Sequence, residues 1–227
     1  MTEGLGLRKM RSISLWTALS LEDRDLLEGL SQRITLDHRE TLFRQDEPAV
    51  SVFNLTEGSL CLYQLLPDGR RQVVGFAVPG DFLGLSLLDS YSVSATALSP
   101  VTACRFERTA FMAFAENNPS LLMHLHEITG HELSLAQEMM MLLGRRTAEE
   151  RIAAFLVGLR LRYERIGQTS VTLELPMGRL DIADHLGLTI ETVSRTLTRF
   201  DRDGLILIVP GGVRLLDGAR LDRLAAQ

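Results

Sequence analysis

Residues 186–200, LGLTIETVSRTLTRF, place a carboxylate, a hydroxyl and a guanidinium at helical spacing. Glu191, Ser194 and Arg195 are three and four residues apart, so a helix brings them to one face. A guanidinium can donate two parallel hydrogen bonds to guanine O6 and N7, and a carboxylate can accept one from the cytosine N4 amino group. The opposite face is apolar and requires a core, with Ile190, Val193, Leu197 and Phe200 at intervals of three and four. The segment therefore predicts an amphipathic helix whose polar face can read base edges.

The twenty residues 179–198, RLDIADHLGLTIETVSRTLT, fit the spacing of a helix-turn-helix. Ala183, at the fifth position, is small enough for a second helix to cross close by. Gly187, at the ninth, tolerates the positive φ that ends the first helix. Val193, at the fifteenth, packs back on the first helix, and Thr189 can cap the second. Helical hairpins in enzymes share this spacing, so the pattern needs support from its surroundings.

Two features outside these helices favour duplex DNA as the ligand. Residues 204–217, GLILIVPGGVRLLD, read as a strand, a Pro-Gly-Gly turn and a strand, which is the pattern of a hairpin wing. Residues 145–227 carry 13 basic and 11 acidic side chains, whereas residues 1–144 carry 11 and 18. A net-basic C-terminal third is the part of the chain suited to a polyanion. A small helical domain for protein contact is the alternative interpretation.

We expect the second helix of this motif to enter the major groove. The residues expected to contact base edges are Glu191, Ser194, Arg195, Thr192 and Ile190, the last against a thymine methyl group. The residues expected to contact phosphates, which fix register without reading sequence, are Arg179, Thr189 and Arg199.

A long helix is predicted to begin at Asn118-Pro119, where asparagine can cap and proline fits the first turn. Beyond it, apolar residues at steps of three and four form a narrow seam over about three heptads, interrupted by Glu132: Leu121, Leu125, Ile128, Leu135, Met139 and Leu142. Such a seam predicts self-association into a homodimer. The alternative is a long helix that lies on the N-terminal domain.

The region 33–107 predicts an antiparallel β domain. Short apolar runs at 52–55, 60–66, 73–78, 95–98 and 103–106 are separated by turn residues, a texture typical of a sandwich, roll or barrel. The clearest hairpin is LLPDGRRQVV, in which Asp-Gly joins two strands. Ser20 predicts a helix start before this region, and Thr147-Ala-Glu-Glu150 is a capping box that opens a helix after it. We expect residues 1–117 to form the β domain with an N-terminal helix, 118–144 the dimerisation helix and 145–227 the winged helix-turn-helix.

Composition and motifs exclude several classes of protein. No apolar run reaches the roughly 18–20 residues that cross a bilayer, and the N-terminus lacks a secretion-signal pattern, so we expect a cytoplasmic protein without a membrane partner. Cys61 and Cys104 are too few for a disulfide scaffold, an iron–sulfur cluster or a Cys-only zinc site. No Walker A or Gly-x-Ser-x-Gly motif is present. Enzymes with a cupin-like β domain bind metal through a His-x-His pair within strands, and the only such pair here, at 124–126, lies in the predicted dimer helix. We expect no catalytic residue, no metal site and no cofactor.

A β-roll, a long dimerising helix and a winged helix-turn-helix together resemble the CRP/FNR family of bacterial transcription regulators. LTEGSLCLYQLLPDGRRQVVGFAVPGDFLGL is similar to the family's β-roll, and ETVSR is similar to the recognition motif of its FNR and FixK branches. The resemblance implies an α+β fold with an N-terminal antiparallel β-roll of the jelly-roll type that binds cyclic nucleotides in other members. It also implies a homodimer on a palindrome of TTGAT-like half-sites, contact with RNA polymerase, and activation in low-oxygen or nitrogen-metabolism control.

Departures from the family pattern select the FixK branch. The glutamate and arginine that bind ribose and cyclic phosphate in the cyclic-AMP receptor branch correspond to Leu85 and Val93, so we expect no cyclic nucleotide to bind. The N-terminus lacks the cysteine cluster by which FNR holds iron–sulfur. Asp46 stands where the family has glycine, and aspartate tolerates a left-handed conformation better than most residues. An effector-gated regulator that binds haem or a small molecule is the alternative, with Cys61, Cys104 and Met112 as candidate contacts, although core packing explains each of them.

Overall fold

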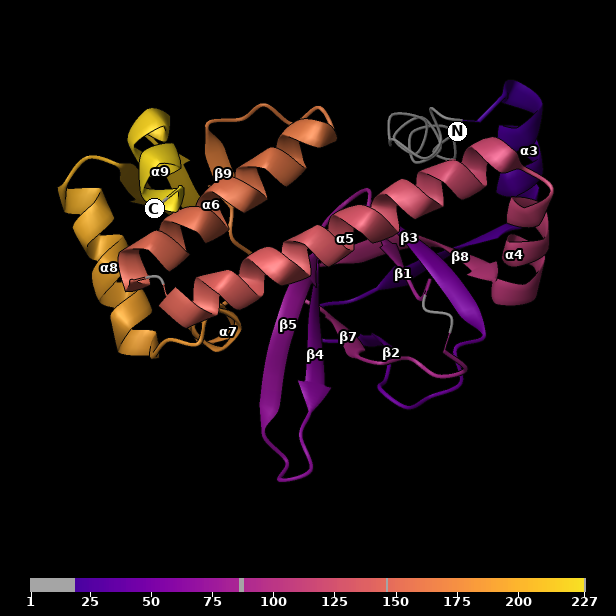
Figure 1. Cartoon of the computed structure of the whole chain (residues 1–227), viewed down its shortest axis with the longest axis horizontal. Helices are drawn as coiled ribbons and strands as arrows, with labels where there is room; N and C mark the ends of the chain where they lie inside the picture. Colours follow the sequence, from indigo (N-terminus) through magenta and orange to yellow (C-terminus); the bar gives the residue numbers. More distant parts are fainter. Residues whose placement is uncertain (1–18, 86–87, 146, 227) are drawn as a thin grey trace. The chain divides into compact units, whose positions relative to one another are not determined.

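The computed structural model describes residues 19–85, 88–145 and 147–226 of the chain (Figure 1). The chain divides into two compact units, residues 1–132 and 133–227. The N-terminal unit is a β domain with helices, and the C-terminal unit contains the helix-turn-helix. The predicted α+β class and the predicted order of parts are therefore confirmed.

Antiparallel strands form the body of the N-terminal unit. Its strands are β1 (Ser31–Leu36), β2 (Thr41–Phe43), β3 (Ser51–Glu57), β4 (Leu60–Leu65), β5 (Arg71–Ala77), β6 (Phe82–Leu83), β7 (Ser94–Ala97) and β8 (Val101–Glu107). Within the described residues they make two four-stranded sheets, in the orders β1-β8-β3-β6 and β2-β7-β4-β5. The predicted Asp-Gly hairpin is the turn between β4 and β5, which pair from Leu60–Ala77 to Leu65–Arg71.

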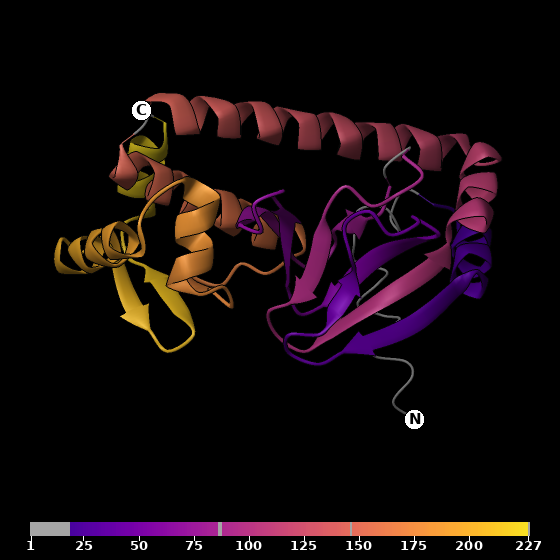
Figure 2. The same cartoon turned by 90° about the horizontal axis from the view of Figure 1, so that it is seen from below.

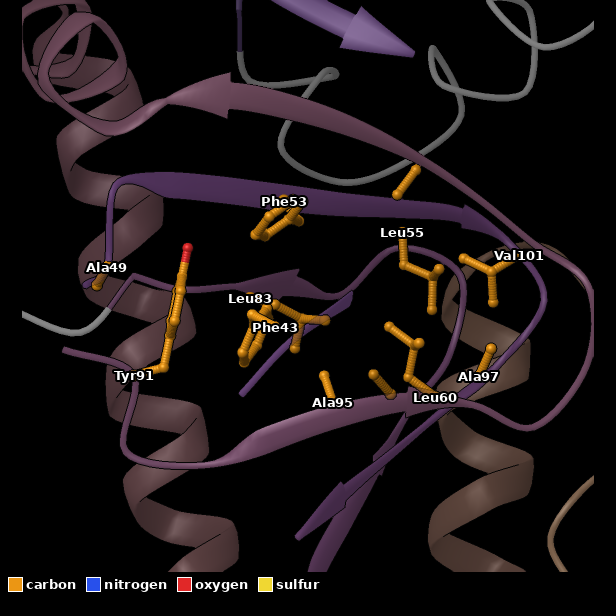
Figure 3. Close-up of a cluster of buried hydrophobic side chains, with 12 residues drawn as sticks. Phe43, Ala49, Phe53, Leu55, Leu60, Leu83, Tyr91, Ala95, Ala97 and Val101 are labelled. Carbon is orange, nitrogen blue, oxygen red and sulfur yellow. The ribbon is translucent and has the colours of Figure 1, made fainter. Parts of the chain in front are cut away.

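The interior of this β domain is filled by aromatic and aliphatic side chains (Figure 3). The Phe43 ring stacks on Tyr91 at a centroid distance of 4.1 Å and on Phe53 at 5.6 Å. The Tyr91 hydroxyl donates to the Ser51 carbonyl at 2.9 Å and accepts from the Ser51 amide at 3.2 Å, so its polar end is satisfied inside the core. The side chains of the two sheets thus occupy the space between them.

Asp46 adopts the left-handed conformation that its place in the sequence suggested, with a φ of 66°. Its amide donates to the Tyr91 carbonyl at 2.9 Å, and the Tyr91 amide donates to the Glu47 carbonyl at 3.0 Å. The turn therefore keeps its geometry without glycine, because these backbone hydrogen bonds fix it on both sides.

Three helices pack on a second apolar cluster of the N-terminal unit. They are α3 (Leu21–Gly29), capped by Ser20, α4 (Arg108–Glu116) and the first part of α5 (Pro119–Arg145). Leu121 is fully buried in this cluster with Phe106 and Phe111, and Leu125 and Ile128 pack against it. Leu121, predicted as a seam residue, therefore packs within its own chain and offers no surface to a second copy. The side chains of Glu132, Leu135, Met139 and Leu142 lie outside the described residues.

The C-terminal unit combines helices with a small sheet. After α5 it contains α6 (Ala148–Arg165), β9 (Thr172–Glu174), α7 (Arg179–Leu186), α8 (Ile190–Arg202), β10 (Ile206–Val209), β11 (Gly212–Leu215) and α9 (Gly218–Ala225). The predicted capping box of Thr147 and Glu150 opens α6. Strands β10 and β11 form the predicted hairpin, seen at the yellow end of the chain in Figure 2, and β11 also pairs with β9. This is the architecture of a winged helix-turn-helix.

Candidate DNA-binding site

The turn between α7 and α8 has the geometry that the sequence predicted. Gly187 ends α7 in the left-handed conformation, with φ 61° and ψ 41°. The Leu188 amide donates to the Ala183 carbonyl at 2.9 Å, which closes the turn. The Thr189 hydroxyl then accepts from the Thr192 amide at 3.2 Å and caps α8. Each signal in the sequence thus corresponds to one contact that sets the course of the chain between the helices.

Apolar packing fixes the angle between the two helices. Ile182, Ala183 and Leu186 of α7 are buried, as are Val193, Leu197 and Phe200 of α8. This confirms the apolar face predicted for α8 with one exception. Ile190, which shares the helical spacing of that face, is 40% exposed. It lies in the first turn of α8, and this exposure leaves it accessible for the thymine-methyl contact also predicted for it.

The polar face of α8 is exposed, and its central side chains have no partner within the described part of the chain. Glu191, Ser194 and Arg195 are exposed, and their side chains form no hydrogen bond or ion pair with any described residue. Thr198 continues this face, although its hydroxyl donates to the Ser194 carbonyl at 2.9 Å. The structure therefore brings the three principal base-reading candidates together on one face.

Thr192 differs from these three residues. Its side chain is half-buried, and one hydrogen bond of 3.0 Å, in which either hydroxyl can donate, joins its hydroxyl to that of Thr189. The N-terminal cap of α8 therefore engages both threonine hydroxyls, and a contact from Thr192 to a base would have to share or break that bond.

The three predicted phosphate contacts have unlike surroundings. Arg179, the first residue of α7, is half-buried, and none of the described residues pairs with its guanidinium. Burial lowers the pKa of Arg179, but arginine stays charged in proteins. Thr189 is exposed at the start of α8. Arg199 instead forms ion pairs with Glu149 of α6 and with Asp203, so it is not free in the way that the sequence suggested.

Two residues that the sequence did not single out hold this assembly together. Arg151 of α6 donates from Nη1 to the Leu186 carbonyl at 3.0 Å, at the C-terminal end of α7 where a positive charge is favourable. The Asp201 carboxylate accepts from the Ile208 amide at 2.8 Å and joins α8 to the wing. The Arg151 contact joins residues 35 apart in sequence, and the Asp201 contact crosses the loop from α8 to the next strand. Neither contact follows from helical or strand spacing.

Leu85 and Val93, the positions that the family resemblance matches to the ligand contacts of the cyclic-AMP receptor branch, carry apolar side chains that pack in the β domain. Leu85 packs against the cluster that contains Phe106, and Val93 packs against the cluster that contains Phe43. Neither residue can pair with a phosphate.

The candidate contacts for haem or another effector also belong to packed regions. Cys61 and Cys104 are buried and form no disulfide, and Met112 packs against the same cluster as Leu85. Burial raises the pKa of the Cys104 thiol to about 11, so it is protonated at neutral pH. These positions agree with core packing for all three residues.

None of the described helices combines the length and the apolar character that a bilayer crossing requires. The described residues also contain no group of three or more histidine, cysteine, aspartate or glutamate side chains arranged to hold a metal ion.

Comparison with known proteins assigns both units to one family. The model for the cyclic nucleotide-binding domain matches residues 33–118, and the model for the Crp-like helix-turn-helix domain matches residues 150–224. The transcriptional activatory protein AadR of Rhodopseudomonas palustris is 52% identical over 217 residues, which cover 96% of this chain and 91% of that protein. The nitrogen fixation regulation protein FixK of Bradyrhizobium diazoefficiens is 47% identical, with 96% and 92% of the two chains covered.

A solved structure agrees with these matches. The structure of FixK2 from Bradyrhizobium japonicum has a TM-score of 0.80 and 34% sequence identity, and the match covers 87% of this chain and 98% of that one. The relatives are transcription regulators and not enzymes. The chain therefore belongs to the CRP/FNR family of DNA-binding transcription regulators, in its FixK branch.

Proposed function

We propose that this protein activates transcription as a homodimer that reads a palindrome of TTGAT-like half-sites. The observation that carries the proposal is the exposed, unpartnered triplet of Glu191, Ser194 and Arg195 on α8, among the residues that the structure describes. A charged side chain without an intramolecular partner keeps its full hydrogen-bonding capacity for a ligand. Similarity to the transcriptional activatory protein AadR supports an activator role, and similarity to the nitrogen fixation regulation protein FixK supports a place in nitrogen-metabolism control. Low-oxygen control is part of the proposal through the resemblance to the FixK branch.

Each member of the triplet has a distinct role in this proposal. Arg195 donates two hydrogen bonds to O6 and N7 of the half-site guanine, and Glu191 accepts from a cytosine N4 amino group. Ser194 lies between them in sequence and contacts a neighbouring base edge or a phosphate. Ile190 contacts a thymine methyl group, and Thr192 makes at most a secondary contact because its hydroxyl bonds that of Thr189.

Phosphate contacts at the edge of the groove set the register of α8. Arg179 and Thr189 stand at the N-terminal ends of α7 and α8, where the helix dipoles also favour an anion. Such contacts bind every DNA sequence about equally. Specificity in this proposal therefore depends on the triplet, and general affinity depends on Arg179 and Thr189.

We propose that α5 forms the dimer interface through its apolar seam. Leu125 and Ile128 are only partly buried, so each retains surface for a second copy. Leu135, Met139 and Leu142 continue the seam in the sequence. A two-fold dimer presents two recognition helices to half-sites about one helical turn apart, ~34 Å.

The remaining parts of the proposal concern the other partners. Contact with RNA polymerase in the cytoplasm completes the activator role. We propose that the protein binds DNA without a cyclic nucleotide, since Leu85 and Val93 supply no polar partner for ribose or phosphate.

Selection of bound sequences from random duplexes by the purified protein tests this function. We expect enrichment of inverted TTGAT-like half-sites whose centres are about one helical turn apart. Enrichment of unrelated or single half-sites would contradict the proposed triplet or the dimer, and absence of any enrichment would contradict sequence-specific binding. An absorption spectrum and a mass spectrum of the same sample test the effector-gated alternative, which predicts a Soret band or a bound mass.

A further inference from the structure

Arg199 on α8, the proposed recognition helix, is paired with carboxylates of its own chain. The guanidinium of Arg199 forms an ion pair through Nη1 with Oε1 of Glu149, in the first turn of α6. The Arg199 Nε atom also lies 3.7 Å from the Asp203 carboxylate. That carboxylate lies 3.2 Å from Nε of Arg202, so Asp203 serves two arginines. Of the two carboxylates that pair with Arg199, that of Glu149 is closer than that of Asp203.

Arg195 and Arg199 are one helical turn apart and line the same groove between α6 and α8, which has a volume of about 810 Å³. Arg195 has no partner in the described part of the chain, whereas Arg199 has two. Both arginine side chains are exposed, that of Arg199 to 53%, so burial does not explain why only Arg199 is paired. Arg199 is paired because the carboxylate of Glu149 lies next to it.

Glu149 is not required for the cap of α6. Glu150 and Thr147 form the capping box, with hydrogen bonds of 2.9 Å and 3.3 Å between side chains and backbone amides. Glu149 lies in the first turn of α6, and its carboxylate faces Arg199 of α8 while Glu150 caps the helix.

Building on the proposed function, we propose that Glu149 limits the affinity of the protein for DNA by holding Arg199 out of phosphate contacts. This replaces the phosphate contact that the sequence suggested for Arg199. Each phosphate that a protein neutralises steepens the dependence of log K on log salt by about 0.9. An exposed ion pair shifts an equilibrium by about fivefold at most. Release of Arg199 should therefore tighten binding by about two- to fivefold per protomer, whatever the DNA sequence.

A double-mutant cycle on the full chain tests this role. Glu149→Gln, Arg199→Gln and the double variant are compared with the unaltered protein on a random-sequence duplex and on a TTGAT-type palindrome, over a series of salt concentrations. We expect Glu149→Gln to tighten binding to both duplexes and to steepen the salt dependence. In the Arg199→Gln background the same change should have no effect.

The other outcomes of this cycle are equally informative. Equal tightening in both backgrounds would show that the carboxylate acts through its own charge, and absence of tightening would show that Arg199 is not withheld; either result overturns the proposal. Glu164→Gln is the matched control, because it removes a carboxylate from the same helix at its other end, where Glu164 pairs with Arg160 at 3.4 Å. It should leave DNA affinity unchanged, and thermal unfolding confirms that each variant is folded.

This experiment can contradict the proposed reading of TTGAT-like half-sites without contradicting the proposed role of Glu149, and the reverse. If the unaltered protein binds the palindrome no better than the random duplex, the proposed reading of TTGAT is contradicted. The cycle on the random duplex still measures whether Glu149 withholds Arg199, because that duplex presents the same phosphates.

Discussion

The interior of the β domain and the polar face of α8 differ in whether their polar side chains have hydrogen-bond partners within the chain. In the β domain the Tyr91 hydroxyl both donates to and accepts from the backbone of Ser51. On α8 the side chains of Glu191, Ser194 and Arg195 form no hydrogen bond or ion pair with any residue that the structure describes. Buried polar groups need internal partners, whereas exposed groups can be kept for a ligand. The contrast indicates that stability resides in the first region and recognition in the second.

If this division holds, substitutions in the two regions should affect different measurements. A change in the β core should alter unfolding and leave the DNA contacts of the folded protein intact. A change on the polar face of α8 should do the reverse.

The largest effect is expected from Arg195→Ala. Loss of a bidentate contact costs about 1–3 kcal/mol, so the two arginines of a dimer account for about 2–6 kcal/mol of binding to a TTGAT-type palindrome. Fluorescence anisotropy with labelled duplex measures this loss. Thermal unfolding should shift little, since Arg195 is exposed and has no partner in the described structure. Arg195→Lys keeps the charge but not the paired donors, and recovery of full affinity by lysine would count against the bidentate contact.

Phe43→Ala should have the opposite profile. Removal of a buried phenylalanine costs about 3–5 kcal/mol of unfolding free energy, and Phe43 stacks on both Tyr91 and Phe53. Urea denaturation followed by circular dichroism measures the loss. Val50→Ala is the control, because Val50 is 57% exposed and its truncation should change stability by less than about 0.5 kcal/mol. Equal effects of the two substitutions would contradict the assignment of Phe43 to the core.

Arg151→Met should have a smaller effect than either of these substitutions. Arg151 supports the turn before α8 but does not belong to the polar face of α8. Its hydrogen bond to the Leu186 carbonyl involves a charged donor, and loss of such a bond costs about 1.5–3 kcal/mol. We expect lower stability of the C-terminal unit and faster amide exchange at the α7–α8 turn. The same substitution at the exposed Arg223 should leave both measurements unchanged. A turn with normal exchange protection in Arg151→Met would show that Arg151 does not stabilise it.

Arg179→Ala should weaken binding to all duplexes to a similar extent. Loss of one phosphate contact reduces the slope of log K against log salt by about 0.9, so a homodimer that loses one contact per protomer changes its slope by about 1.8, or roughly sixtyfold per tenfold change in salt. Titrations of a TTGAT-type palindrome and of a random duplex at several salt concentrations measure both quantities. A loss confined to the palindrome would place Arg179 among the base-reading residues instead.

The smallest effect concerns the thiols of the β domain. Burial raises the pKa of Cys104 to about 11, so it supplies little thiolate at pH 8, and burial keeps Cys61 out of contact with solvent. We expect both to remain unreactive towards a thiol reagent in the native protein at that pH and to react after denaturation. As the pH rises from about 9, the pKa of an unperturbed thiol, an exposed cysteine would become more reactive whereas Cys104 should lag behind it. Rapid labelling of the native protein would contradict the packed interior.

The sequence predicted those elements whose signals are local. Gly187 and Thr189 mark the turn because the backbone there needs a left-handed residue and a capping hydroxyl, and both roles follow from neighbours within four residues. The Asp-Gly hairpin and the Thr147 capping box were predicted for the same reason. Residues at helical spacing likewise indicated which side of α8 is buried.

Contacts between distant segments could not be predicted in this way. Glu149 and Arg199 are fifty residues apart, and periodicity does not say which charged side chains meet. The burial of Leu121 within its own chain is a related case. An apolar residue on a helix fits a neighbouring domain as well as a second helix, and only the packing against Phe106 and Phe111 distinguishes the two.

The ties from Arg151 to the end of α7 and from Asp201 to the wing have a thermodynamic consequence. The first bond joins α6 to α7, the second joins α8 to the hairpin, and buried apolar side chains hold α7 against α8, so the helix-turn-helix and wing are ordered before DNA binds. Association then spends little free energy on ordering the protein. Its heat-capacity change should reflect the surface buried at the interface and contain no contribution from coupled folding.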